Sequence, residues 1–226
     1  MSDPASGSRH SEAASADLIA DPEERARREA ENGLKQFDSV VSLVQRYQAE
    51  HWRFALRVST IRGLHRDALL GIHPLAGNFR PSTVKIVGSM HQPPDAWQVP
   101  VLVEELCDYV NDQWTASPAL HLAAYVMWRL NWIHPFADGN GRTARAVSYL
   151  VLCMKMGGRI AGTRTIPDLI SQNKGLYYDT LEAADKSLVS SQALDLSELE
   201  GVLENLLANQ LVSALEEASG HPIVQQ

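Results

Sequence analysis

Apolar side chains recur every three or four residues along most of the chain, the spacing that lets a helix bury one face. Asp21-Pro22 and Ser117-Pro118 suit helix starts, and Gly71 and Gly157-Gly158 suit helix ends. The pattern predicts one helix from Pro22 to a break at Asn32-Gly33, then helices around 34–50, 52–70, 99–110, 118–133, 143–156, 166–185 and 196–215.

One segment follows a different pattern. Residues 83–87 (TVKIV) are β-branched and alternate, Gly88-Ser89 offers a turn, and prolines 81, 93 and 94 bound the region. These signals predict a short β-hairpin. The predicted fold class is therefore all-α with one hairpin.

The length of 226 residues fits one domain with appendages. Residues 1–22 are rich in Ala, Ser and Asp, which predicts a flexible N-terminal tail. We expect N-terminal helices over 23–50, with a regulatory role left open, a core domain over 51–190, and an acidic C-terminal helix and tail over 191–226.

Features of membrane and secreted proteins are missing from the sequence. No apolar stretch approaches the ~20 residues of a membrane span, and the N-terminus lacks the apolar core of a signal peptide. Cys107 and Cys153 lie within apolar helical patterns, which favours reduced core thiols. We therefore expect a cytoplasmic protein.

The net charge of −7 argues against nucleic-acid binding, and its distribution is uneven. Residues 1–31 hold eight acidic and four basic side chains, and residues 187–226 hold six acidic ones with no Lys or Arg. The residues between them carry a net +3. The acidic side chains are therefore concentrated near the two ends of the sequence, and the central part is mildly basic.

The most informative segment is 134–145, HPFADGNGRTAR, which joins two predicted helices. Pro135 disfavours helical geometry at His134, and the glycines around Asn140 allow the backbone to approach a ligand closely. Amides of such a turn at a helix N-terminus converge on an anion. Asp138 stands where a carboxylate can share Mg²⁺ with phosphates, and His134 adds a base of near-neutral pKa. This set suits phosphoryl-type transfer.

A plainer interpretation is also open, in which 134–145 is a polar loop whose arginines pair with Asp138. The segment is not a Walker A loop, because the lysine of that motif is absent.

The segment resembles the motif of the Fic family, HxFx(D/E)GNGRxxR. It matches every specified position: His134, Phe136, Asp138, Gly139, Asn140, Gly141, Arg142 and Arg145. The stretches IRGLHRDALLG, AGNFR, VKIVGSMHQPP and NKGLYYDTL also look like Fic sequence, so the resemblance covers roughly 52–181. The related Doc kinases carry lysine in place of the second glycine, whereas Gly141 is intact here.

The resemblance implies a Fic-type helical bundle and a role for each motif residue. His134 is the expected general base, and Asp138 the expected Mg²⁺ ligand. Gly139, Asn140 and Gly141 are expected to form the anion hole, with Arg142 at the leaving pyrophosphate and Arg145 at the γ-phosphate of ATP. Phe136 is expected to anchor the loop in the core.

The resemblance also implies contacts outside the motif. The hairpin is expected to act as a flap that pairs with the backbone of a target protein. Asn173 and Tyr178 look like contacts on the nucleotide side. The flap residues are Val84, Lys85, Ile86, Val87, Gly88 and Ser89.

Many Fic proteins carry an inhibitory helix of the form [S/T]xxxE(G/N). Glu31-Asn32 supplies its acidic end, but Arg27 stands where Ser or Thr is expected. Ser213 with Glu217 and Ser8 with Glu12 have the spacing without the final Gly or Asn. We favour Glu31 as the inhibitory residue, and a solvated acidic helix face remains the alternative.

The implied function is protein adenylyltransferase: AMP passes from ATP to a Ser, Thr or Tyr hydroxyl of a target protein, and pyrophosphate leaves. Alternatives are removal of AMP, transfer of another nucleotide at the same site, or a non-catalytic nucleotide-sensing partner. ATP and Mg²⁺ are the expected co-substrate and cofactor. Self-modification and a homodimer are open, and neither a membrane nor a nucleic acid is an expected partner.

Overall fold

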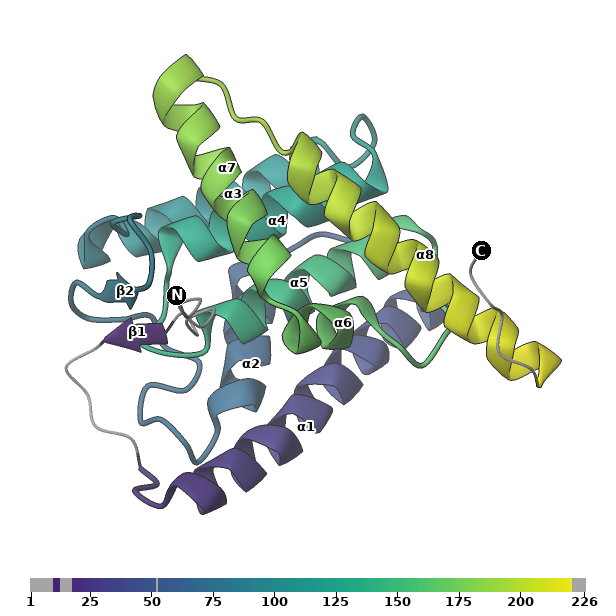
Figure 1. Cartoon of the computed structure of the whole chain (residues 1–226), viewed down its shortest axis with the longest axis horizontal. Coiled ribbons are helices and arrows are strands. Elements are labelled where there is room, and N and C mark those ends of the chain that lie inside the picture. The colour runs from purple at the N-terminus through teal and green to yellow at the C-terminus, as the bar shows by residue number, and fades with distance from the viewer. Residues whose placement is uncertain (1–9, 13–17, 52, 221–226) are drawn as a thin grey trace, which may run out of the picture.

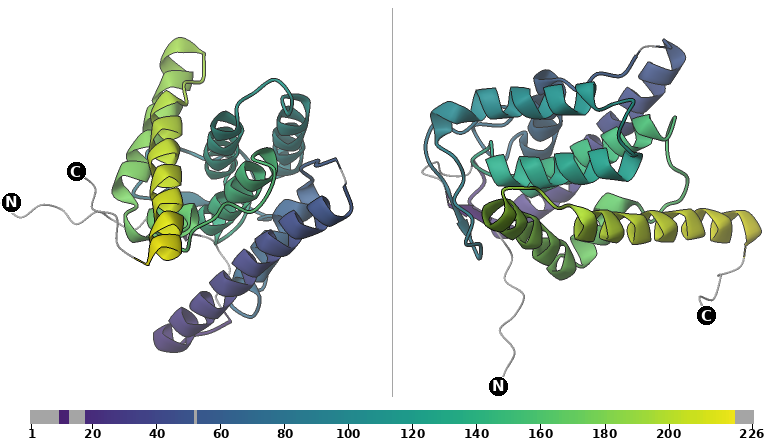
Figure 2. Two further views of the ribbon diagram at one scale, coloured as in Figure 1. Left: turned by 90° about the vertical axis from the view of Figure 1, so that its right-hand side faces the viewer. Right: turned by 90° about the horizontal axis from the view of Figure 1, so that it is seen from above.

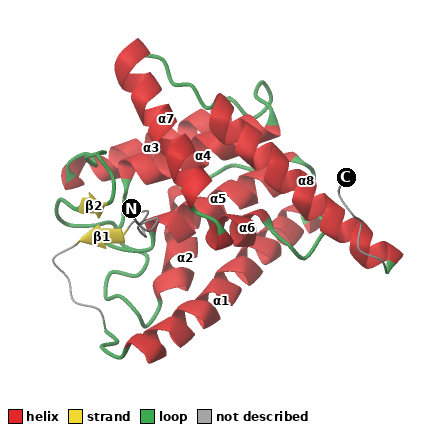
Figure 3. Ribbon diagram, viewed as in Figure 1, coloured by secondary structure: helices red, strands yellow, loops and turns green. Residues whose placement is uncertain are grey.

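The structure, a computed structural model, describes residues 10–12, 18–51 and 53–220, and these form mainly helices joined by loops, with two short strands (Figures 1 and 3). The all-α prediction is therefore confirmed. In chain order the elements are β1 (His10–Glu12), α1 (Pro22–Ala49), α2 (Val58–Leu69), β2 (Lys85–Val87), the 3₁₀ turn η1 (Ala96–Gln98), α3 (Val99–Asp112), α4 (Ala119–Ile133), α5 (Asn140–Lys155), α6 (Ile166–Gln172), α7 (Gly175–Ser191) and α8 (Ser197–Ser219).

Helix α5 lies at the centre of the molecule and packs against α4, α1 and α2 (Figure 1). Helices α7 and α8 pack on each other and on α4, and α1 lies on the other side (Figure 2). Because α5 has neighbours on several sides, Ala144, Val147, Leu150 and Val151 are all fully buried. A helix that is apolar on most of its surface is expected in such a position. This packing holds the first turn of α5 rigidly.

Helix α1 is continuous through Asn32-Gly33, so the predicted break is wrong. Asn32 is buried, and its side-chain amide donates to the carbonyl oxygens of Ala68 (3.3 Å) and Leu70 (2.9 Å) at the end of α2. These bonds satisfy carbonyls that a helix end leaves without partners. Gly33 lies on the exposed side, where it costs the helix about 1 kcal/mol.

Two other helix boundaries differ from the prediction. The helix expected over 52–70 begins at Val58, and the helix expected over 166–185 is divided into α6 and α7 at Asn173-Lys174. Gly71, with φ +76°, follows the end of α2 as predicted. Periodicity therefore located the helices, whereas the interhelical contacts that set their ends lie outside any local pattern.

The predicted extended segment is present, but its partner is not the second arm of a hairpin. β2 pairs with β1 in an antiparallel arrangement, with His10 opposite Val87, Ser11 opposite Ile86 and Glu12 opposite Lys85. The flexible tail predicted for residues 1–22 falls largely outside the described residues; within it, His10–Glu12 form β1 and α1 begins at Pro22. A strand from the chain's start therefore lies on the predicted flap.

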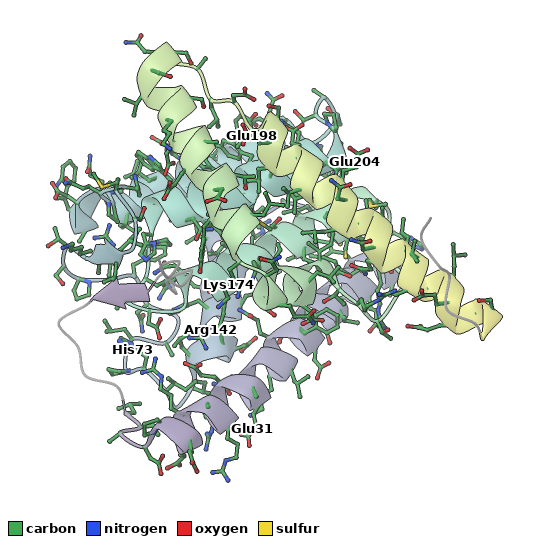
Figure 4. All side chains as sticks on the ribbon, viewed as in Figure 1. Glu31, His73, Arg142, Lys174, Glu198 and Glu204 are labelled. Atoms are coloured by element: carbon green, nitrogen blue, oxygen red, sulfur yellow. The ribbon has the colours of Figure 1, made fainter. Side chains whose placement is uncertain are left out.

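Among the described residues, no helix is long and apolar enough to cross a membrane. Cys107 and Cys153 are both buried free thiols, as predicted. The acidic C-terminal region forms α8, whose outer surface exposes Glu198 and Glu204 (Figure 4).

Candidate active site

A cavity of about 340 Å³ opens where α4 ends and α5 begins, within the size range of small-molecule sites. The predicted motif residues His134, Asp138, Gly139, Asn140, Gly141, Arg142 and Arg145 all line it. The remaining wall comes from α1, the flap, α4 and α7: Arg25, Glu29, Ile86, Ser89, His91, Trp128, Asn131, Trp132, Lys174, Tyr178, Leu181 and Asp185. Tertiary packing thus brings three separate segments, α1, the flap and α7, to the motif and the helix that precedes it.

His134 caps the C-terminus of α4 in the left-handed region, at φ 51° and ψ 58°. Its Nδ1 lies 3.3 Å from the carbonyl oxygen of Asn131. A carbonyl can only accept a hydrogen bond, so Nδ1 carries the proton in the neutral ring and Nε2 is the basic nitrogen. The ring is therefore oriented for proton acceptance at Nε2.

Burial lowers the pKa of His134 from 6.5 to about 4, outweighing the hydrogen bond to Asn131, which raises it. The C-terminus of a helix favours the charged imidazolium, which conflicts with a base that must start neutral. Desolvation resolves this conflict, because it removes the water that would stabilise the charge. His134 is consequently neutral at pH 7.

Asp138 and Gly139 form the turn into α5. Asp138 Oδ1 accepts a hydrogen bond of 2.6 Å from the Gly139 amide, while Oδ2 accepts bonds from Arg25 Nη2 (3.1 Å) and Arg142 Nη2 (3.4 Å). Gly139 has φ +73°, and a Cβ there would lie 2.3 Å from Leu69 Cδ2. Glycine is thus required at position 139 both for the backbone angle and for the space.

The side chain of Asn140 holds the loop in shape. Its Oδ1 accepts from the Phe136 amide at 2.9 Å, and its Nδ2 donates to the Phe136 carbonyl at 2.8 Å. Phe136 is fully buried and stacks on His65 with ring centroids 3.7 Å apart, in accord with its predicted anchoring role. Since both polar ends of Asn140 are engaged, only its backbone N–H remains for an anion.

The N-terminus of α5 supplies backbone donors to the cavity. The first bond within the helix runs from the Thr143 amide to the Gly139 carbonyl at 3.0 Å. The amides of residues 140–142 precede this bond, so helix geometry gives them no acceptor inside α5. With the positive end of the helix dipole, they form an anion-binding site. A Cβ on Gly141 would lie 3.3 Å from Arg145 Nη1, so glycine keeps that guanidinium in place.

Arg142 and Arg145 place two cations at this site. Arg142 is 3.5 Å from Glu29 and 3.4 Å from Asp138, so the ion pair of the plainer polar-loop interpretation is present. Burial lowers the pKa of Arg145, and Tyr177 and Tyr178 act in the opposite direction. Two cations and the helix N-terminus together favour a polyanionic ligand.

Two buried residues that the sequence did not single out hold the loop from behind. His65 Nδ1 accepts from the Gly77 amide at 2.8 Å, so its Nε2 carries the proton donated to the Asp138 carbonyl at 3.0 Å. Burial lowers the pKa of His65 to about 4, which preserves this neutral form. His65 lies in the stretch IRGLHRDALLG, and the second residue, Arg80, ends the stretch AGNFR. The Fic-like sequence around the motif was therefore the signal that could have pointed to both residues.

Arg80 is the second of these residues. Its Nε donates to the His134 carbonyl at 2.7 Å and its Nη1 to the Ser82 carbonyl at 2.9 Å, and Nη2 bonds the carbonyl oxygen of Pro94. Arg80 therefore ties the two ends of the flap region to the backbone of His134.

The inhibitory role expected for Glu31 does not agree with its position. Its carboxylate pairs with Arg28 at 3.5 Å and is half exposed, and Figure 4 shows Glu31 and Arg142 on opposite sides of α1. Arg25 and Glu29 reach the cavity instead. They lie one helical turn apart on the same face, while position 31 is rotated about 200° from position 29 by the 3.6-residue repeat.

Of the two residues expected on the nucleotide side, only one lines the cavity. Tyr178 lines the cavity, but Asn173 is exposed at the end of α6 and is not among the lining residues. Lys174 lines the cavity in its place, and Figure 4 shows it near Arg142. The break between α6 and α7, which the sequence pattern did not predict, puts Asn173 outside.

The flap residues also differ in whether they line the cavity. Ile86 is buried and lines the cavity with Ser89, whereas Lys85 and Gly88 are exposed and Val84 and Val87 are intermediate. His91 follows the flap and is 2.7 Å from the Trp132 carbonyl. One face of β2 therefore belongs to the cavity and the other does not.

This fold and this loop are found in known proteins. Residues 55–152 match the model of the Fic/DOC family. The solved structure of a Fic-domain-containing signalling protein from Bacteroides thetaiotaomicron superposes with a TM-score of 0.68 at 23% identity, over 91% of this chain and 78% of that one. Fic-1 from C. elegans superposes with a TM-score of 0.66 at 19% identity, over 89% of this chain and 55% of that one.

Sequence relatives agree with the structural neighbours. A protein adenylyltransferase Fic from Drosophila willistoni is 32% identical over 149 residues, 64% of this chain and 26% of the relative. The protein of that name from Aedes aegypti is 31% identical over 135 residues, 58% of this chain and 25% of the relative. The chain thus spans about a quarter of the length of these relatives. The matching part of this chain, residues 55–152, is similar to the Fic/DOC family.

Proposed function

We propose that this chain is a protein adenylyltransferase, which transfers AMP from ATP to a Ser, Thr or Tyr hydroxyl of a protein and releases pyrophosphate. The observation that carries the proposal is the placement of a neutral His134 beside the N-terminus of α5 in one cavity. The names of the Drosophila and Aedes relatives support it, as does the AMPPNP bound to the BepC effector protein of Bartonella tribocorum, which superposes with a TM-score of 0.56 at 15% identity.

Each residue of the cavity has a separate role in the proposed reaction. The target hydroxyl attacks the α-phosphorus of ATP and gives its proton to His134 Nε2, while the bond to pyrophosphate breaks. Backbone amides 140–142 and the arginines neutralise the phosphate charge, which is commonly the largest contribution to such catalysis. Arg142 faces the leaving pyrophosphate and Arg145 the γ-phosphate. Tyr178 and Lys174 flank the nucleotide.

The carboxylate of Asp138 fits a Mg²⁺ ion. It is an oxygen ligand in a cavity built for phosphates, and the described residues contain no cluster of three His, Cys, Asp or Glu that could hold a metal alone. Mg²⁺ is commonly held by one or two carboxylates with substrate phosphates and water completing its shell. When bound, Mg²⁺ would neutralise charge on the phosphates.

The setting of the reaction follows from the same features. We place it in the cytoplasm, where the buried thiols of Cys107 and Cys153 would stay reduced. The target protein is expected to pair its backbone with the edge of β2, next to Ile86 and the cavity.

The test compares the wild type with His134→Ala. Purified protein is incubated with Mg²⁺, a cell lysate and labelled ATP, GTP, UTP or CTP, and ATP affinity is measured by calorimetry. A positioned general base is worth ~10²–10⁴ in rate, so the variant should lose transfer by about that factor. ATP affinity should stay within about twofold, because His134 holds no phosphate.

The alternatives give different results. Preference for another nucleotide would identify a different transferred group, and release of AMP from labelled proteins would identify the reverse reaction. Nucleotide binding with no label on any protein would replace the proposal by a non-catalytic sensing role. Loss of ATP affinity together with activity in His134→Ala would contradict its assignment as a base.

A further inference from the structure

A large aromatic side chain is exposed just before α3, on the far side of the flap region from β2. Trp97 in η1 is 77% exposed, and Val101, one helical turn later in α3, is 56% exposed. Tryptophan is enriched at protein–protein interfaces and among the residues that contribute most of the binding energy there. This pair of exposed apolar residues therefore marks a candidate interaction surface.

The turn that carries Trp97 is fixed in place. Asp95 and Gln98 form a capping box around η1, in which the Asp95 amide donates to Gln98 Oε1 at 3.1 Å. Val99, the next residue, is fully buried in the core. A side chain presented on a fixed turn loses less conformational freedom on binding than one on a mobile loop. Trp97 is thus preorganised for a partner.

This turn lies close to the catalytic loop. Arg80 binds the carbonyl oxygens of both Pro94 and His134, so one guanidinium separates the two backbones. Trp97 is three residues after Pro94, and its Cα is at most about 11 Å from that of Pro94. Figures 1 and 2 show α3 beginning on the same side of the molecule as β2. An interface of standard size, about 800 Å² on each partner, is wide enough to include both the flap and Trp97.

Beyond Val101 the same side of α3 is acidic. Positions 97, 101, 104 and 108 follow the spacing of one helix face, and Glu104 and Asp108 are both exposed. The sequence contains no Lys or Arg between Lys85 and Arg129, and Arg129 lies 3.5 Å from the neighbouring Glu105. We call Trp97, Val101, Glu104 and Asp108 the α3 face. It is apolar at the end next to the flap and negatively charged beyond it.

We propose that the α3 face docks the protein that receives AMP, and that this protein presents an apolar pocket bordered by Lys or Arg; this rests on the adenylyltransferase function proposed above. The edge of β2 offers backbone groups, which any extended segment can pair with, so selectivity requires side-chain contacts elsewhere. Trp97 and the carboxylates supply such contacts. A second copy of this chain fits the face poorly, because two acidic faces would repel each other.

The first experiment removes the indole. Wild type and Trp97→Ala are incubated with labelled ATP and Mg²⁺, and the initial rate of lysate-protein labelling is measured against total lysate concentration. The half-saturating lysate concentration should rise by about tenfold or more, because a docking contact is lost. The rate at saturation and the Kd for ATP should stay within about twofold. Val189→Ala, which shortens an 84% exposed side chain on α7, is the control and should match the wild type. An unchanged half-saturating concentration in Trp97→Ala would overturn the docking role.

The second experiment tests the charge of the partner. Raising NaCl from about 50 to about 300 mM should slow wild-type labelling by about threefold or more, because salt screens the attraction. The double variant Glu104→Lys with Asp108→Lys should label more slowly at low salt and lose this dependence. Glu198→Lys with Glu204→Lys makes the same change of charge on exposed residues of α8 (Figure 4) and should behave as the wild type. Equal salt dependence in all three proteins would overturn a basic partner.

The outcomes separate this inference from the function on which it rests. Labelling of lysate proteins that is unaffected by the changes on the α3 face would overturn the inference and leave the adenylyltransferase function standing. A wild-type dimer that Trp97→Ala converts to a monomer in light scattering would overturn it too, by assigning the face to a second copy. No label on any protein would overturn both.

Discussion

At the scale of single residues, burial and backbone geometry set the chemistry of the motif. His134 sits at a helix C-terminus in the left-handed region, yet desolvation lowers its pKa to about 4 and keeps it neutral. Asn140 carries a polar side chain in the anion-hole sequence, but both ends of that side chain are bonded to Phe136. The motif sequence predicted which residues meet at the cavity, and the contacts decided how each side chain is held there.

Gly139 gives a stability prediction with a matched control. Gly139→Ala adds a Cβ 2.3 Å from Leu69 at φ +73°, so it incurs both a clash and left-handed strain. We expect the free energy of unfolding, measured in urea, to fall by roughly 2–4 kcal/mol. Gly157→Ala, at φ +87° with no atom within 4 Å, has the strain alone and should lose only about 1 kcal/mol. Equal losses would remove the clash from the explanation.

Arg80 gives a prediction about positioning. Arg80→Lys keeps the charge but cannot donate at once to the carbonyls of His134, Ser82 and Pro94. We expect kcat to fall by about tenfold or more while the Kd for ATP changes less than twofold, because the backbone of His134 loses its tether. Arg62→Lys is the control: Arg62 is more exposed and donates to Gly77 and Asn78, so this variant should keep the wild-type kcat. A matched loss of ATP affinity would assign Arg80 to folding instead.

At the scale of elements, α1 is the part whose role the sequence located least well. The Asn32-Gly33 pair suggested a helix end, yet Asn32 binds the last carbonyls of α2 and α1 continues. Because α1 is one unbroken helix, its packing against α2 fixes how it is rotated about its own axis. That rotation decides which of its side chains face the cavity. Arg25 and Glu29 do so, and Glu31 does not.

The contacts of α1 predict a restraint on nucleotide binding. Arg25 pairs with the Asp138 carboxylate that Mg²⁺ would require, and Glu29 pairs with Arg142. Partly exposed pairs of this kind are worth roughly 0.2–1 kcal/mol. Arg25→Ala and Glu29→Ala should each tighten Mg²⁺-dependent ATP binding by about two- to fivefold in calorimetry.

Glu31→Ala is the matched control on the same helix. The carboxylate of Glu31 pairs with Arg28 and lies outside the cavity, so the affinity for ATP should stay at the wild-type level. Tighter ATP binding by Glu31→Ala, with no change in Glu29→Ala, would contradict the orientation of α1 in the structure.

At the scale of the whole molecule, two buried histidines predict how stability depends on pH. Burial lowers the pKa of His65 and of His134 from 6.5 to about 4. The unfolded chain then binds more protons than the folded one as pH falls below about 6.5, so stability is lost between pH 6.5 and 4. Each histidine contributes up to about 3 kcal/mol to this loss.

Urea unfolding at pH 7 and at pH 4.5 measures this effect. In His65→Gln the loss of stability between the two values should be smaller than in the wild type by roughly 2 kcal/mol. His51→Gln, at an exposed histidine between α1 and α2, is the control and should lose as much stability as the wild type. An equal loss in His65→Gln would contradict the neutral buried state of His65.

The sequence by itself determined the helical class, the position of the loop 134–145 and the residue types that this loop brings together. These properties depend on local terms: the spacing of apolar residues, the conformations open to glycine and proline, and the residue types that bind phosphate. Only the tertiary structure decided the neutral state of His134, the hydrogen bonds from His65 and Arg80 to the loop, the position of Glu29 rather than Glu31 at the cavity, and the pairing of β1 with β2. Desolvation and contacts between distant segments appear only when the chain is packed, so no local pattern carries them.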